Sequence, residues 1–134
     1  MFIEVAILSA LAKTLHYRVP ERYRDRVEVG MRVLVPLGRR VALGLVLNIS
    51  YGAPAGTEEV TFRDIAAPVD NHPVITEELI LLCRWIARYY FYPLGAVLQS
   101  ALPGEIQAKP IAGFRLSGRQ PSSPVPERLR PLWD

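Results

Sequence analysis

The stretch Val29–Leu47, VGMRVLVPLGRRVALGLVL, decides the fold class. In its first half, apolar residues alternate with other residues, which is the pattern of a half-buried strand. Its second half, Val41–Leu47, is apolar and branched, with Gly44 in the middle, which predicts a second strand. The intervening turn, Gly38–Arg40, is short. Together these features predict a β-hairpin that belongs to a small barrel or curved sheet.

The predicted turn carries two adjacent arginines, Arg39 and Arg40. Their charge is not needed for folding, because neutral residues can close a turn equally well. Two guanidinium groups on a solvated tip suit an anionic partner, and phosphate fits their fork of donors best. We therefore expect the hairpin to face a phosphate-bearing ligand.

Further strands and then helices are predicted on either side of the hairpin. Short segments bounded by turn residues indicate strands at residues 2–8, 14–19, 31–37, 41–49 and 60–69. The period then becomes helical. Thr76 is placed to cap a helix that Pro93 ends, and a second helix is expected at 94–101. The prediction is an α+β fold: a small antiparallel OB-like β-barrel or curved sheet, capped by two C-terminal helices and followed by an irregular tail.

The length and composition indicate one domain with a tail. We expect a β-barrel and helices over residues 1–105, and at 106–134 a linker or the start of a further unit, because proline and serine are frequent there. A single cysteine, Cys83, excludes an internal disulfide, and its place on an apolar helix face predicts a buried thiol. There is no leader-like segment and no apolar run long enough to span a membrane, so we expect a cytoplasmic protein.

No catalytic constellation is found in the sequence. It contains neither a P-loop nor a metal-ligand spacing of His and Cys. The acidic pair at the predicted helix start, Glu77-Glu78, is explained by the helix dipole. We therefore expect no enzyme activity, metal or cofactor in this chain.

Basic residues are concentrated in the first third of the chain. Residues 13–40 contain eight Lys or Arg and three acids, a net charge of +5, whereas the chain as a whole carries +3. The predicted phosphate contacts are Lys13, Arg18, Arg32, Arg39 and Arg40. A basic cluster of this kind favours nucleic acid as the partner.

The run Tyr89-Tyr90-Phe91-Tyr92 ends the first predicted helix. We expect these rings to pack in the core at the end of the helix. The alternative is a platform on which bases stack, with the hydroxyl groups reaching water.

Two motifs together resemble a known family. The segments TLHYRVP (14–20), VGMRVLVPLGRR (29–40) and ARYYFYPLGAVLQSALP (87–103) occur in the order and at the distances seen in the N-terminal DNA-binding domain of PriA, the bacterial replication-restart helicase or primosomal protein N′. The resemblance covers about residues 1–105. It implies a module that recognises the 3′ end of the nascent leading strand at a stalled fork.

The resemblance also implies a pocket for the terminal nucleotide. Its residues fall on Leu15, His16, Gly38 and Arg63, and the pattern of residues 15–17 adds Tyr17. Leu15 stands where the family has an aromatic residue and offers apolar contact without stacking. His16 stands where the family has an acid, and only its neutral form can accept a hydrogen bond from a 3′-hydroxyl.

The implied partners are branched or single-stranded DNA with a 3′ end, the remaining helicase domains, and other primosome or single-strand-binding proteins. The alternatives are a protein-interaction barrel, or a regulatory domain of a larger ATPase that does not itself bind DNA. Residues 106–134 are then either the approach to a winged-helix domain of a longer protein or the end of a shortened gene product.

Overall fold

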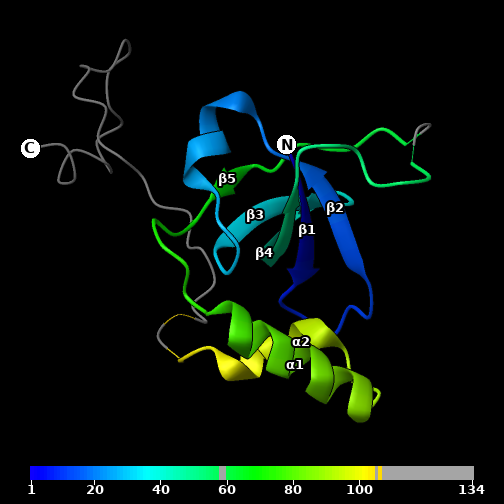
Figure 1. Cartoon of the computed structure of the whole chain (residues 1–134), viewed down its shortest axis with the longest axis vertical. Coiled ribbons are helices and arrows are strands. Elements are labelled where there is room, and N and C mark those ends of the chain that lie inside the picture. The colour runs from blue at the N-terminus through cyan, green and yellow to red at the C-terminus, as the bar shows by residue number, and fades with distance from the viewer. Residues whose placement is uncertain (58–59, 105, 107–134) are drawn as a thin grey trace, which may run out of the picture.

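The computed structural model describes residues 1–57, 60–104 and 106. The strands are β1 (Phe2–Ile7), β2 (Thr14–Arg18), β3 (Arg32–Leu37), β4 (Arg40–Ser50) and β5 (Ala67–Pro68). A 3-10 helix, η1 (Glu21–Arg26), follows β2, and two α-helices, α1 (Glu77–Tyr89) and α2 (Leu94–Ala101), end the described fold. The strands form one antiparallel sheet in the order β2-β1-β4-β3-β5, with the two helices side by side at one end (Figure 1). The predicted α+β class is confirmed.

The sheet curves until its two edges meet, which gives the OB-like shape. The backbone N–H of Arg18 on β2 donates to the carbonyl of Arg63 (2.9 Å), and the N–H of Ile65 donates to the carbonyl of Arg18 (3.0 Å). A few residues later, the same segment pairs with β3 as strand β5. The segment before β5 therefore bridges the two open edges of the barrel.

The predicted fifth strand at 60–69 is wrong in extent, because only Ala67–Pro68 forms a strand. The segment turns from β2 to β3 within a few residues. The N–H of Ile65 still bonds to β2, whereas the N–H of Ala66 donates to the carbonyl of Leu34 on β3. Pro68 has no N–H to donate and limits the ladder further. Sharing the segment between two partners prevents a long ladder with either one.

Two apolar cores lie on the two sides of β1 and β4. The barrel interior contains Ile3, Val5, Tyr17, Val33, Val35, Val46 and Ile65. The second core lies between the sheet and the helices and contains Ala6, Leu45, Leu47, Ile80, Cys83 and Leu98. Adjacent residues of β4 thus face different cores, which explains its continuous apolar run. The expected burial of Cys83 is confirmed, at 1% exposure.

Two local features predicted from the sequence, the glycine of the hairpin turn and the N-terminal cap of α1, are present in the structure. Gly38 has a φ of +60°, and Leu37 pairs with Arg40 across it, which is the pattern of a type II′ turn with glycine at its first central position. The Thr76 hydroxyl accepts from the N–H of Leu79 (3.4 Å), so the predicted cap is confirmed.

The predicted tail lies outside the described residues, apart from Ile106. Within the part of the chain that the structure describes, no helix is long and apolar enough to cross a membrane.

Candidate nucleic-acid interface

The predicted site spans two elements, β2 and the β3–β4 turn, and the region between them is here called the gap. These two elements do not pair in the sheet, but a side chain connects them: the Tyr17 hydroxyl donates to the carbonyl of Pro36 (2.9 Å). Tyr17 is 4% exposed, and burial raises the pKa of its hydroxyl, an effect that the nearby Arg63 opposes. Its ring has no free face for a base. Tyr17 therefore connects β2 to the end of β3 and offers no ring face to a nucleotide.

The third side of the gap is formed by Arg63. Its guanidinium donates to the carbonyl of Gly38 (3.0 Å), while its own carbonyl accepts from Arg18 on β2. Three predicted residues that are distant in sequence, Tyr17, Gly38 and Arg63, are thus brought together. A Cβ on Gly38 would meet nothing within 4 Å, so the turn is open to solvent.

One edge of β2 has no strand neighbour before Arg18. In an antiparallel strand, successive residues direct their backbone groups alternately to one neighbour and the other. Arg18 bonds away from β1, toward Arg63 and Ile65, and its partner on β1 is Phe2. By this alternation, the N–H and C=O of His16 also point away from β1, where no described residue bonds to them. An unpaired donor and acceptor at a strand edge form a ready-made binding template.

The side chains of Leu15 and His16 lie on opposite faces of β2. Leu15 is half-buried and packs against the barrel interior. His16 is exposed and lines a shallow recess of about 210 Å³ with Glu4, Asn48 and Ser50. The side chains of these two predicted pocket residues therefore point away from each other, Leu15 toward the barrel interior and His16 toward the recess on the other face.

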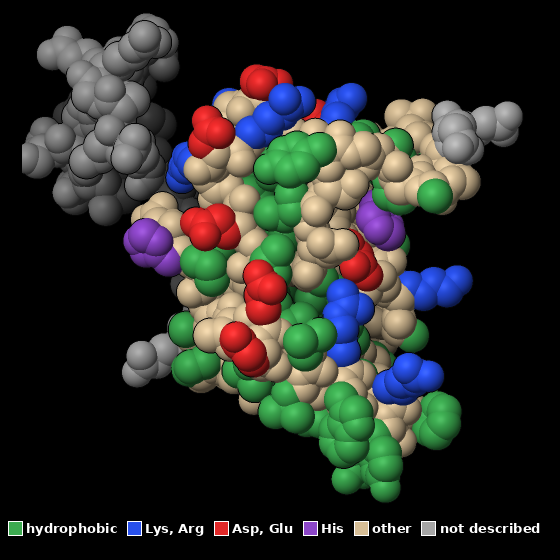
Figure 2. Space-filling view, in the orientation of Figure 1, with side chains coloured by type: hydrophobic (Ala, Val, Ile, Leu, Met, Phe, Trp, Pro, Cys, Tyr) green, Lys and Arg blue, Asp and Glu red, His purple; other side chains and the backbone are tan. Residues whose placement is uncertain are grey.

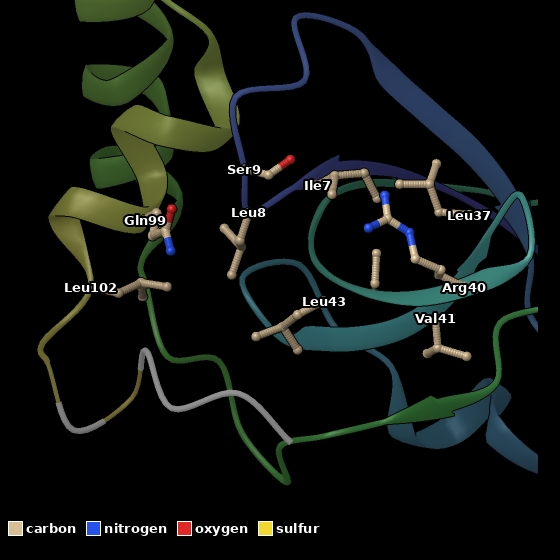
Figure 3. A pocket seen from close by; sticks show the side chains of 10 residues that line it. Ile7, Leu8, Ser9, Leu37, Arg40, Val41, Leu43, Gln99 and Leu102 are labelled. Atoms are coloured by element: carbon tan, nitrogen blue, oxygen red, sulfur yellow. The ribbon is translucent and has the colours of Figure 1, made fainter. Parts of the chain in front are cut away.

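Arg39 and Arg40 are exposed beside the gap, and neither forms an ion pair with a described residue. Arg40 also lines a pocket of about 460 Å³ between the hairpin, the end of β1 and α2 (Figure 3). The remaining lining is mostly apolar, including Ile7, Leu37 and Val41. This volume lies in the range typical of ligand pockets.

The other predicted phosphate contacts differ in whether an acidic side chain already pairs with them. Lys13 is exposed at the start of β2 and forms no ion pair with a described residue. Arg18 forms an ion pair with Asp64, Nε to Oδ1 at 2.5 Å. This hydrogen bond lowers the pKa of the Asp64 carboxyl and raises that of Arg18. Arg18 is still 57% exposed, so it can be approached by a ligand.

Arg32 is held within the fold. Its Nη2 lies 2.5 Å from Oδ1 of Asp70, its Nε and backbone N–H both donate to the same carboxylate, and its Nη1 donates to the carbonyl of Ile106. The two charged side chains are only 13% and 11% exposed. This geometry changes the expected role of Arg32: it anchors the segment after β5 to β3.

Sequence reasoning missed the acids that engage these arginines. Asp64 and Asp70 lie 46 and 38 residues from their partners, and no local spacing relates them. Ser9 and Gln99, the neutral polar side chains of the larger pocket, come from a loop and a helix and carry no motif. Within the described ranges, no three His, Cys, Asp or Glu residues are grouped to hold a metal ion.

The chain also matches a known protein family. The family model for the PriA 3′ DNA-binding domain, 3′BD, matches residues 4–103. The chain belongs to this family. The matched range includes both edges of the gap and the two helices, and so covers the whole candidate interface.

Curated relatives carry the same family name. The chain is 28% identical to the replication restart protein PriA of Treponema pallidum over 84% of this chain and 18% of the relative. It is 28% identical to the Bacillus subtilis protein over 84% of this chain and 14% of the relative. It is 32% identical to the Chlamydia muridarum protein over 77% of this chain and 14% of the relative. The chain thus spans less than a fifth of the length of the curated relatives it matches.

Proposed function

We propose that this PriA-family domain binds the 3′ end of single-stranded or branched DNA, as a stalled fork presents it, in a replication-restart protein. The observation that carries the proposal is the gap itself. Arg63 joins β2 to the turn, because its carbonyl accepts from the N–H of Arg18 and its guanidinium donates to the carbonyl of Gly38, and the backbone of His16 on β2 has no partner among the described residues. Backbone groups can bond to a nucleotide whichever base it carries, so we expect no sequence preference.

The charges around the gap support an anionic ligand. Arg39 and Arg40 on the turn are free to contact phosphates, and Lys13 and Arg18 flank β2. Each phosphate neutralised releases counterions, so affinity should fall with salt. The pocket beside Arg40 offers apolar walls of a size suited to one nucleotide unit.

Fluorescence anisotropy with a labelled fork tests the binding role. For single strands, log K falls with log salt by about 0.7 per phosphate contact, so Arg39→Ala/Arg40→Ala should reduce the slope by about 1.4. Arg24→Ala is the matched control, because Arg24 is an exposed arginine on η1 that pairs with Glu21. Equal slopes for the double variant and the wild type would remove the turn from the interface.

End recognition needs a separate test. Forks whose leading strand ends at the junction in a 3′-hydroxyl should bind more tightly than forks with a 3′-phosphate there. Gly38→Asn should weaken this preference, because asparagine tolerates positive φ but places a side chain in the open turn. Equal affinity for the two forks in the wild type would contradict end recognition while leaving DNA binding intact.

The chain spans less than a fifth of the length of its curated relatives, so we assign it only a part of their activity. We propose that helicase action, and contacts with other primosome or single-strand-binding proteins, belong to the full-length protein in the bacterial cytoplasm, and that this domain contributes DNA binding without catalysis. A protein-interaction barrel is the competing function, and the exposed apolar side chains of α1 favour it. It predicts no change of anisotropy with any DNA at low salt.

A further inference from the structure

The rings at the end of α1 are exposed, so the expected core packing of this run is wrong. Trp85, Tyr89, Tyr90, Phe91 and Tyr92, here called the aromatic surface, are between 58% and 95% exposed. Figure 2 shows apolar side chains gathered and protruding at the helical end of the molecule. A monomeric domain rarely leaves this much apolar area in water unless a ligand covers it.

The backbone conformation at Phe91 is energetically unfavourable for a residue with a bulky side chain. The N–H of Tyr92 donates to the carbonyl of Ala87 (2.9 Å), the 6→1 bond of a Schellman motif, which places Phe91 at the position that usually carries glycine. Phe91 has a φ of +52°, the only positive φ among the described non-glycine residues. An exposed bulky side chain in this conformation gains nothing from burial. Strained residues of this kind cluster at binding sites.

The rings are arranged as stacking surfaces. Trp85 and Tyr89 are stacked, with centroids 5.1 Å apart and planes 20° from parallel. Tyr89 and Tyr90 meet edge to face at 5.0 Å. Phe91, which is 95% exposed, can offer both faces of its ring. Successive exposed rings are the means by which proteins hold the bases of a single strand without reading their sequence.

The charge around the aromatic surface favours nucleic acid over an apolar protein surface. Arg88 and Lys13 are exposed, and neither pairs with an acid in the described part of the chain. Arg88 lines a recess of about 330 Å³ with Ala12, Phe91 and Tyr92. The acids of α1 lie at its opposite end, in the first turn. Rings beside unpaired cations match stacked bases linked by phosphates.

The aromatic surface is continuous with the proposed 3′-end site. Ala12 lines the recess beside Phe91, and β2 runs from there to the gap at His16. Four residues of extended chain cover about 13 Å. A single strand with its 3′ end in the gap can therefore follow β2 past Lys13 and reach the rings within a few nucleotides.

We propose that the aromatic surface is a second contact for single-stranded DNA, which stacks bases a few nucleotides to the 5′ side of the terminal one. This inference rests on the proposed DNA-binding function but not on recognition of the 3′-hydroxyl. The domain then binds a strand at two places: at the barrel by its end, and at α1 by its bases.

Trp85 supplies a direct probe. The chain has two tryptophans, so Trp133→Phe leaves Trp85 as the only one. Oligothymidylate with a free 3′-hydroxyl, and the same strand with a 3′-phosphate, should both quench its fluorescence as bases stack. In anisotropy, Phe91→Gly and Tyr89→Ala should each weaken binding by about tenfold, as expected for the loss of one stacked base. Leu81→Ala is the matched control, because Leu81 is a 65% exposed apolar residue of the same helix without a ring.

The outcomes separate this inference from the proposed function. If both strands quench Trp85 equally and the ring variants weaken both, the second contact stands even where end recognition fails. If the wild type binds but Trp85 is not quenched and the ring variants bind as tightly as Leu81→Ala, the inference is overturned. The aromatic surface would then be a site for protein, and the 3′-end proposal would be unaffected.

Discussion

Replacing Phe91 by glycine should stabilise this domain, although it deletes a large side chain. The left-handed conformation costs an L-residue about 1–2 kcal/mol, and glycine avoids that cost. Glycine also has more conformational freedom in the unfolded chain, which lowers the free energy of unfolding by about 0.4–1 kcal/mol and offsets part of this stabilisation. Because Phe91 is 95% exposed, almost no burial is lost with its ring. The net expectation is an increase of about 0.5–1 kcal/mol in the free energy of unfolding.

Thermal and urea unfolding monitored by far-UV circular dichroism measure this change. For a domain of this size, the increase corresponds to a rise in Tm of about 2–5 °C. Phe91→Ala is the matched control, because alanine also lacks the ring but keeps the strained φ of +52°. Its Tm should stay close to that of the wild type. Equal Tm values for the glycine and alanine variants would refute the argument that strain is held at this residue.

Three other substitutions test contacts inside the fold. Tyr17→Phe removes the bond to Pro36 and should cost about 0.5–1.5 kcal/mol in urea unfolding. Burial raises the pKa of the Tyr17 hydroxyl above its unfolded value, which is near 10. The stabilisation by this hydroxyl is therefore complete below about pH 10 and is lost as the pH rises through the folded pKa. The wild type should lose stability above about pH 10, and the variant should lose less. Asp70→Ala leaves Arg32 unpaired at low exposure and should cost about 3 kcal/mol, whereas a loss below about 1 kcal/mol would mean that the pair is solvated. Gly95→Ala should fail to fold or lose most of its helical signal, because a Cβ there would lie 1.8 Å from the carbonyl oxygen of Ile7; a Tm near that of the wild type would contradict this packing of α2 on β1.

Local patterns predicted most of the elements. The alternation at 33–37, the turn at Gly38 and the cap at Thr76 each depend on residues within a few positions, and the structure has all three. The extent of the last strand could not be predicted this way. Whether residues 60–66 form a ladder depends on two strands competing for the same backbone groups, and both competitors are distant in sequence.

The two faces of α1 show the same limit. Helical periodicity marks Leu82, Trp85 and Tyr90 as apolar in the same way as Ile80 and Cys83. The structure buries only Ile80 and Cys83, because the sheet and α2 cover one side of the helix. Periodicity reports which side chains are apolar, but not whether another element lies opposite them.

By itself, the sequence determined the class of the fold, the position of its hairpin turn and the basic character of its first third. These depend on short-range sterics, on the alternation of side chains and on charge, all of which are local. Only the tertiary structure decided which charges are free and which groups meet. It paired Arg32 with Asp70, left Arg39 and Arg40 open, and placed Arg63 against the turn. Those outcomes depend on how a curved sheet brings its two edges together, and no short stretch of sequence encodes that approach.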